Sequence, residues 1–276
     1  MVPESAFLLE TGRLMDISPN WWKTLFDEVY LVTDARSVCD EELTLREIDL
    51  LETYLKPGRN DRILDLCGGE GRHSLEMARR GYEKLIVLDY SDFLVRRGKD
   101  KAVEMGHNVH FLRSDARQPG LKAGKFRYVI LMANSFGYCL SDEENERMLH
   151  EAWRLLEAGG EMLLDLCDPD YVSKNFRPFS RHEANEDVVV IRERELDRNR
   201  IMTRESVLSK ARGLIREGTY CETIYTEGRI NKLLAKAGFE EVQIRRNFSS
   251  HKHTGDYGFM TDRMIVIGSK GKHVTG

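Results

Sequence analysis

A carboxylate and three glycines lie close together in residues 63–73, which read ILDLCGGEGRH. An apolar run ends near Asp65, passes through Gly68, Gly69 and Gly71, and then takes on the pattern of a helix. Glycine lets a backbone turn sharply and approach a ligand closely. Because ligands of open α/β sheets bind at such strand-to-helix turns, we predict a ligand-binding turn here. A tight turn that needs glycine only for its own geometry is the alternative.

The same residues exclude two common nucleotide sites. The dinucleotide fingerprint GxGxxG fails, because Gly69 and Gly71 would require a third glycine where Ser74 stands. A phosphate-binding P-loop would require Gly-Lys-Ser/Thr after the turn, and no such triplet follows. A carboxylate at Asp65 would repel a pyrophosphate, whereas it suits a ligand that carries an ammonium group.

The surrounding elements alternate between strand and helix patterns. Short apolar runs occupy residues 63–66, 85–88, 109–112, 128–133 and 162–166, and amphipathic stretches such as 74–80, 93–105 and 143–156 separate them. This alternation predicts βαβ units and a doubly wound, mainly parallel sheet. We expect glycines in 157–160 to stop the helix before the fifth strand.

The pattern changes after Asp170. Residues 187–196 and 201–212 are strand-like around a turn at 197–200, and a third strand is expected over 213–221. A helix at 227–237, ended by Gly238, precedes two further strands at 242–246 and 264–267. We therefore predict three parts. These are an N-terminal helical cap at 1–58, a core at 59–170 and 222–276, and an antiparallel insertion at 171–221 that forms part of an acceptor pocket.

The stretch from the first to the fifth predicted strand resembles the class I S-adenosylmethionine-dependent methyltransferases. Their first motif, D/E-x-G-x-G-x-G, is matched by Asp65, Gly69 and Gly71, with Cys67 in place of the first glycine. Asp89 ends the second strand, where the family binds the ribose hydroxyls. Asp115 follows the third strand, where the family contacts the adenine amino group.

The resemblance implies a Rossmann-like, seven-stranded sheet whose last strand is antiparallel. It implies S-adenosylmethionine as methyl donor and S-adenosylhomocysteine as product. An aromatic side chain on the N-terminal helices, Tyr30, would meet the sulfonium of the donor, and core packing beside Trp21 and Trp22 is its alternative role. The implied donor-binding residues are Tyr30, Asp65, Cys67, Gly68, Gly69, Gly71, Asp89, Tyr90, Asp115, Ala116 and Asn134.

The fourth predicted strand leads into MANSFGY at residues 132–138, where the family faces both the donor and the substrate. Asn134 and Tyr138 are therefore the candidate catalytic residues, one of which positions the acceptor. Alternatively, Asn134 caps the next turn and Tyr138 packs under the sheet. This segment resembles small-molecule N- and O-methyltransferases, including bacterial sugar-amine enzymes. It lacks the Asn/Asp-Pro-Pro-Tyr/Phe motif of methylases that act on planar nitrogens.

We therefore predict methyl transfer to nitrogen or oxygen of a small molecule. A protein or peptide methyltransferase and a non-catalytic donor-binding module are the alternatives. His251 and His253 are further candidate bases on a polar loop. The two histidines lack an identifiable third ligand, and the five cysteines contain no CxxC pair, so we expect free thiols and no metal.

Composition sets the remaining expectations. The 276 residues are 41% hydrophobic and 32% charged, with a formal net charge of -4, which disfavours nucleic acid as a partner. No apolar run approaches the length of a membrane span, and the first residues lack the pattern of a secretory signal. We expect a cytoplasmic protein that acts without a membrane. Its oligomeric state stays open, with a homodimer as one alternative.

Overall fold

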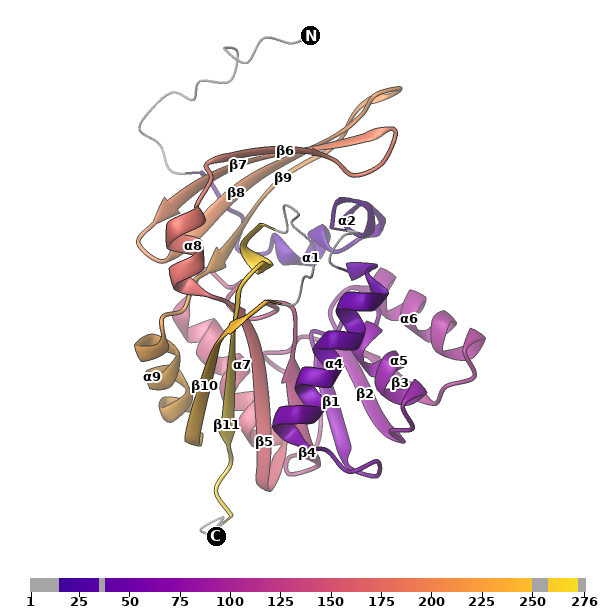
Figure 1. Cartoon of the computed structure of the whole chain (residues 1–276), viewed down its shortest axis with the longest axis vertical. Coiled ribbons are helices and arrows are strands. Elements are labelled where there is room, and N and C mark those ends of the chain that lie inside the picture. Colours follow the sequence, from indigo (N-terminus) through magenta and orange to yellow (C-terminus); the bar gives the residue numbers. More distant parts are fainter. Residues whose placement is uncertain (1–14, 35–37, 250–257, 273–276) are drawn as a thin grey trace.

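The computed structural model describes residues 15–34, 38–249 and 258–272. They form a large sheet wrapped by helices and a smaller sheet that lies across one end of it (Figure 1). The first two short helices lie between the two sheets. No helix within the described ranges is long and apolar enough to cross a membrane.

The large sheet has seven strands in the order β10-β11-β5-β4-β1-β2-β3. Neighbouring strands are parallel except around β11, which is antiparallel to both β10 and β5. This order confirms the predicted seven-stranded sheet with an antiparallel last strand. The strands are β1 (Arg62–Leu66), β2 (Lys84–Asp89), β3 (Val109–Arg113), β4 (Phe126–Leu131), β5 (Leu156–Cys167), β10 (Glu240–Phe248) and β11 (Arg263–Ser269).

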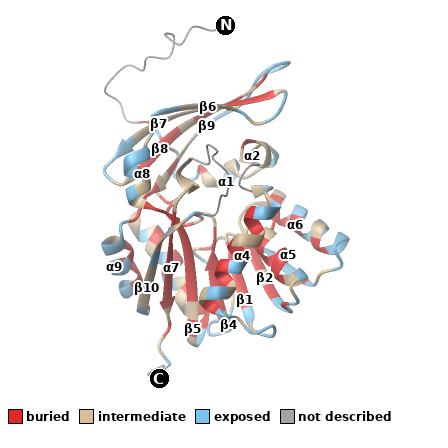
Figure 2. Cartoon of the chain, viewed as in Figure 1, coloured by how far each residue is buried: buried red, intermediate tan, exposed pale blue. Residues whose placement is uncertain are grey.

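Helices cover both faces of this sheet. One apolar cluster joins the sheet to α7 and α9, and a second joins its other face to α4, α5 and α6. Figure 2 shows the buried residues concentrated along the strands between these layers. The helices are α4 (Glu41–Leu55), α5 (Arg72–Arg79), α6 (Asp92–Glu104), α7 (Asp142–Leu155) and α9 (Glu227–Ala237).

Short polar side chains begin these helices. Asp40, Ser91, Ser141 and Thr226 each accept a hydrogen bond from a backbone N–H in the first turn of α4, α6, α7 and α9, respectively. The helix α9 ends at Gly238, whose φ of 99° closes the last turn in the left-handed conformation. The bounds of α9 are those expected from the sequence, because both its start and its stop are coded locally.

Strand β5 begins earlier than the sequence indicates. The glycines at 157–160 were expected to separate α7 from a strand at 162–166, but β5 starts at Leu156, directly after the helix. The reason is a distant partner. Gly159 N–H donates to the Lys270 carbonyl, and Lys270 N–H donates to the Gly160 carbonyl, which draws this segment into the sheet.

The smaller sheet is fully antiparallel, in the order β6-β7-β8-β9. The hairpin between β7 and β8 turns at Arg198, whose φ is 56°, within the predicted turn. Helix α8 and strand β6 were not expected, because α8 is one short capped segment and β6 pairs only at an edge. The elements are α8 (Pro169–Asn175), β6 (Phe179–Glu183), β7 (Val188–Asp197), β8 (Arg200–Ser209) and β9 (Gly213–Thr223).

The N-terminal segment packs under the smaller sheet. It contains α1 (Trp22–Leu25) and α2 (Glu28–Thr33), and the side chain of Asp27 caps α2. Trp21 is buried in a cluster with Met202 and Cys221 of the smaller sheet. The helices at this end of the chain are therefore fixed to the smaller sheet as well as to the core.

A buried arginine joins three elements of the core. Arg263 of β11 forms ion pairs with Glu47 of α4 and Asp165 of β5, and all three side chains are at most 1% exposed. Glu47 also pairs with Arg72 and lies 2.8 Å from His73 Nε2, both on α5. Burial alone would raise the pKa of Glu47, but Arg263 and Arg72 hold it well below its ordinary value.

We expect Arg263→Met to lower the free energy of unfolding by about 3–5 kcal/mol, because it leaves Asp165 buried without its cation and removes one of the two arginines that pair with Glu47. Lys236→Ala is the control. The side chain of Lys236 is 68% exposed in its ion pair with Glu146, so this variant should lose less than about 1 kcal/mol of stability. Urea denaturation followed by circular dichroism measures both. Equal costs for the two variants would contradict a structural role for the buried cation.

Candidate active site

A cleft lies at the carboxyl ends of the central strands of the large sheet. It has an open volume of about 1100 Å³ and is lined by the turn after β1, the ends of β2, β3 and β4, and the N-terminal helices. We call it the donor cleft. All the predicted donor-binding residues except Gly71 and Asn134 line it: Tyr30, Asp65, Cys67, Gly68, Gly69, Asp89, Tyr90, Asp115 and Ala116.

Two of the glycines in the turn are required by packing inside the protein. A Cβ on Gly68 would lie 2.6 Å from Cγ of Asp65, and one on Gly71 would lie 2.7 Å from the ring of Phe111. Gly69 has room around it but a φ of 57°, which side-chain-bearing residues rarely adopt. The turn therefore needs glycine for its own geometry, as the alternative interpretation held, while it also forms a wall of the cleft.

Asp65 carries a buried carboxylate oxygen without a hydrogen-bond donor. Its side chain is 1% exposed, and its Oδ2 accepts a hydrogen bond from the Ser74 hydroxyl at 2.9 Å. Among the described residues, no group donates to its Oδ1. Burial raises the pKa of Asp65. A buried acceptor of this kind at the cleft is suited to an ammonium group of a ligand.

Asp89 links the turns that follow β1 and β2. Its Oδ2 accepts a hydrogen bond from Gly69 N–H and its Oδ1 accepts one from Ser91 N–H, both at 2.8 Å. Burial raises its pKa. Because an ionised carboxylate offers about four lone-pair positions, each oxygen keeps one for a ligand hydroxyl.

Aromatic and basic residues surround Asp115 at the end of the cleft. Arg117 binds Asp115 with its Nε and one terminal nitrogen, and its guanidinium lies 4.8 Å from the ring centre of Trp22. Trp22 also meets Tyr90 edge to face, with ring centres 4.8 Å apart. Burial alone would raise the pKa of Asp115, but the hydrogen bonds and the charge of Arg117 lower it below its ordinary value. The sequence reasoning did not assign Arg117 or Trp22 to the site, although Arg117 stands only two residues after Asp115.

A second cavity of about 850 Å³ adjoins the donor cleft beneath the smaller sheet. We call it the acceptor cavity. Its lining comes from the N-terminal helices, α4, the loop after β4 and the inner face of β8 and β9. The residues that line both spaces are Phe26, Tyr30, Val38, Arg72, Ala133 and Tyr138.

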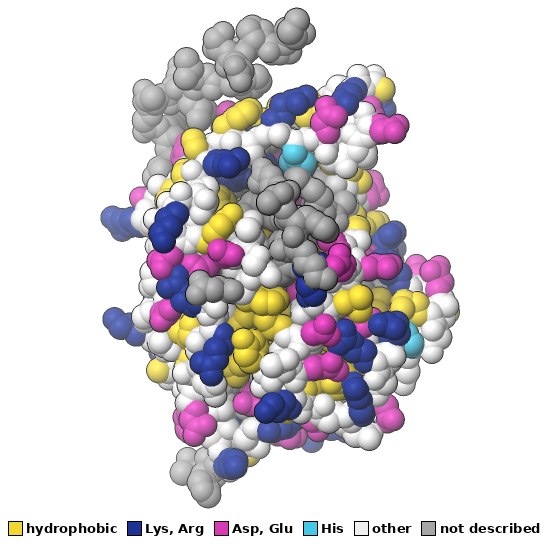
Figure 3. Space-filling model, viewed as in Figure 1, with side chains coloured by type: hydrophobic (Ala, Val, Ile, Leu, Met, Phe, Trp, Pro, Cys, Tyr) yellow, Lys and Arg dark blue, Asp and Glu magenta, His cyan; other side chains and the backbone are white. Residues whose placement is uncertain are grey.

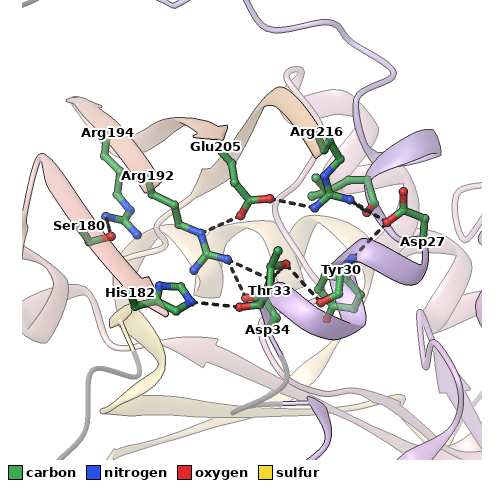
Figure 4. A network of polar contacts seen from close by, with 11 residues as sticks. Asp27, Tyr30, Thr33, Asp34, Ser180, His182, Arg192, Arg194, Glu205 and Arg216 are labelled. Atoms are coloured by element: carbon green, nitrogen blue, oxygen red, sulfur yellow. Dashed lines mark hydrogen bonds and ion pairs between the residues drawn. The ribbon is translucent and has the colours of Figure 1, made fainter. Parts of the chain in front are cut away.

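Ion pairs join the smaller sheet to α2 above the acceptor cavity (Figure 4). Glu205 of β8 bonds Arg192 of β7 and Arg216 of β9, each at 2.8 Å. Arg192 continues to Asp34 just after α2, and Arg216 continues to Asp27 just before it. The roof of the cavity is therefore fastened to the helix that carries Tyr30.

Asn134 and Tyr138, the predicted catalytic residues, both reach the acceptor cavity. Asn134 Oδ1 accepts a hydrogen bond from Cys167 N–H at 3.2 Å, and its Nδ2 donates to Glu222 Oε2 at 2.9 Å. The ring of Tyr138 packs against Trp21, with ring centres 5.2 Å apart. Asn134 thus has protein partners at both ends of its amide, and the catalytic assignment of both residues stays a prediction.

The remaining candidates contribute less to the described site. His251 and His253 lie outside the described residues. Cys139 and Cys167 are buried free thiols, as interpreted, whereas Cys67 is partly exposed at the donor cleft. In the part of the chain that the structure describes, no group of three His, Cys, Asp or Glu side chains could hold a metal ion.

We expect Asn134→Gly to lower the free energy of unfolding by about 1–3 kcal/mol, because it leaves the buried Cys167 N–H without a partner. Glycine tolerates the φ of 57° at this position, so the loss reports the amide rather than backbone strain. Asn175→Gly is the matched control and should cost less, because this exposed asparagine donates a hydrogen bond to the Tyr171 carbonyl and satisfies no buried N–H among the described residues. Thermal denaturation would refute this role if the control were the more destabilised protein.

Comparisons with known proteins agree with this geometry. Residues 63–160 match a family described as a methyltransferase domain. A curated relative, the eEF1A lysine and N-terminal methyltransferase of Bos taurus, is 27% identical over 139 residues, which are 48% of this chain and 20% of that protein. This chain therefore spans about a fifth of the length of that relative.

Solved structures extend the similarity over most of the chain. An S-adenosylmethionine-dependent methyltransferase from Clostridium acetobutylicum superposes with a TM-score of 0.68 at 14% identity, covering 88% of this chain and 97% of that one. The sugar N-methyltransferase KedS8 from Streptoalloteichus gives 0.61 at 17% identity, covering 96% and 98%. Residues 63–160 therefore match a methyltransferase domain, and the chain as a whole shares the fold of these S-adenosylmethionine-dependent methyltransferases.

Proposed function

We propose that this chain binds S-adenosylmethionine in the donor cleft and transfers its methyl group to nitrogen or oxygen of a small molecule in the acceptor cavity. The observation that carries this proposal is that the two cavities adjoin and share a wall, which includes Tyr30, Ala133 and Tyr138. Two ligands that both contact these shared lining residues would meet in a defined orientation, as a displacement reaction requires.

The residues of the donor cleft fit the donor. The unpartnered Oδ1 of Asp65 would receive the ammonium of its amino-acid part, and the remaining lone pairs of Asp89 would receive its ribose hydroxyls. When bound, the donor supplies a methyl group already activated by a sulfonium. The acceptor cavity argues against the alternative of a non-catalytic donor-binding module, because such a module would have no use for a second polar cavity.

The architecture of the acceptor cavity supports a small acceptor. Strands β8 and β9 of the smaller sheet line it, and the ion pairs of Arg192 and Arg216 fasten this sheet to the N-terminal helices. The sugar N-methyltransferase KedS8 shares the fold. A protein acceptor is the second candidate, because the eEF1A methyltransferase matches in sequence. On the face in Figure 3, acidic and basic side chains are intermixed, which supports the further proposal that nucleic acid is not the acceptor.

We expect Asp89→Asn to weaken the binding of S-adenosylmethionine at least tenfold, because it removes the charge from two hydrogen bonds worth about 1.5–3 kcal/mol each. Asp92→Asn, a change at an exposed carboxylate on α6, should leave the affinity unchanged. Isothermal titration calorimetry measures both dissociation constants. An unaltered affinity in a folded Asp89→Asn protein would remove Asp89 from the donor site.

We expect the protein to transfer labelled methyl groups from S-adenosylmethionine to components of a metabolite extract and not to a protein extract freed of small molecules. Tyr220→Ala, which changes the lining of the acceptor cavity alone, should reduce this transfer at least tenfold while the donor binds normally. Mass spectrometry of the labelled products decides between the candidates. Label confined to proteins would favour the protein acceptor instead.

A further inference from the structure

We propose that Glu222 is the recognition group for the acceptor and that the acceptor is a protonated amine. This inference rests on the proposed function and deepens it, because it names the class of molecule that the acceptor cavity receives. Glu222 lies near the end of β9, on the inner face of the smaller sheet, and lines the acceptor cavity. Neither the motifs nor the resemblance pointed to this residue.

Glu222 lies beside the residues that line both cavities. Its Oε2 accepts a hydrogen bond from Nδ2 of Asn134, which directly follows Ala133, a residue that lines both spaces. Tyr138, on the same shared wall, feels the charge of Glu222, which together with burial raises the pKa of the tyrosine. The carboxylate is thus held next to the region where donor and acceptor would meet.

Among the described residues that line the acceptor cavity, Glu222 is the carboxylate without an ion pair. The lining arginines Arg72, Arg216 and Arg263 each form an ion pair with a carboxylate of the protein. The other lining carboxylates are likewise paired with arginine: Asp34, Glu47 and Glu205. Among the described residues, Glu222 has a hydrogen bond to an amide and no cation within ion-pair distance.

An ammonium group would complete this arrangement. Burial raises the pKa of Glu222, with Arg194 and Arg192 opposing the rise from farther away. A buried carboxylate gains from a positively charged donor, since charge-assisted hydrogen bonds are about twice as strong as neutral ones. A carboxylate ligand would instead lie against a residue of like charge, so this cavity favours amines over acids.

The chemistry of methyl transfer also favours a carboxylate at this place. A protonated amine has no lone pair, so one proton must leave nitrogen before the reaction. Glu222 accepts that proton, the nitrogen lone pair forms the new N–C bond, and the S–C bond of the sulfonium breaks with its electron pair going to sulfur. The products are the methylated amine and S-adenosylhomocysteine, and the proton passes from Glu222 to water.

The test uses two donor analogues and requires no knowledge of the acceptor. Sinefungin carries an amino group on carbon in place of the methyl sulfonium, whereas S-adenosylhomocysteine has no group at the position of the methyl. The ratio of their affinities therefore reports whether a protein group faces that position. We expect Glu222→Gln to lower the preference for sinefungin about tenfold or more, without weakening S-adenosylhomocysteine. Glu217→Gln is the matched control, because this exposed residue lies on the same strand. It should leave the ratio unchanged.

The outcomes separate this inference from the proposed function. Binding of S-adenosylhomocysteine with an unchanged ratio in Glu222→Gln would overturn the role of Glu222 and leave the donor site in place. Failure of the wild-type protein to bind S-adenosylhomocysteine would overturn both. Should Glu222→Gln not fold, Glu222→Asp keeps the charge on a shorter side chain and should keep part of the preference, whereas a complete loss with Asp would contradict a charge-based role.

A measurement on the unaltered protein adds a second line of evidence. The preference for sinefungin over S-adenosylhomocysteine should disappear as the pH falls and Glu222 takes up a proton. Contacts that both ligands make with the protein cancel in the ratio of the two affinities. A ratio that stays constant down to the pH of unfolding would overturn the proposal. The charged and titratable groups that act on Glu222 or on which it acts are Asp34, Tyr138, Cys167, Arg192, Arg194, Tyr220 and Cys221.

Discussion

The buried cation of Arg263 is the constraint on which the arrangement of the site depends. It lies between Glu47 and Asp165, and removing it would leave the buried Asp165 without its cation and Glu47 with Arg72 as its remaining arginine partner among the described residues. Asp165 Oδ2 also accepts a hydrogen bond from Ala133 N–H, in the wall between the two cavities. Glu47 holds Arg72 at the start of the helix that follows the glycine turn. One network therefore holds Arg72 and Ala133, two of the residues that line both cavities, in a fixed relation.

The parts of this fold that could be predicted from sequence are those coded over short distances. Parallel strands buried on both faces read as apolar runs, and the helices between them carry their own caps, as Thr226 and Gly238 do for α9. The donor residues Asp65 and Asp89 could be found because each stands at the carboxyl end of a strand, and parallel strands bring such ends together at one edge.

The rest depends on partners that are remote in the chain. Glu222 and its hydrogen-bond partner Asn134 are 88 residues apart, and Arg263 and Glu47 are 216 residues apart. Nothing in the local pattern separates such side chains from other charged residues. Strand β5 shows the same limit, because its glycine-containing start joins the sheet only through the segment that contains Lys270. Long-range pairing, not local propensity, decided each of these features.

The two cavities differ in what holds their walls. Backbone geometry shapes the turn beside the donor cleft. Gly68 and Gly71 leave no room for a Cβ, and Asp89 accepts hydrogen bonds from two backbone N–H groups. Few substitutions are therefore compatible with this turn. Side chains of the smaller sheet shape the acceptor cavity, where a change at β8 or β9 alters charge without disturbing the turn. The chain of Arg192, Glu205 and Arg216 nevertheless fastens this sheet to α2, whose Tyr30 lines both cavities. These ion pairs therefore tie the sheet that lines the acceptor cavity to a helix that also lines the donor cleft.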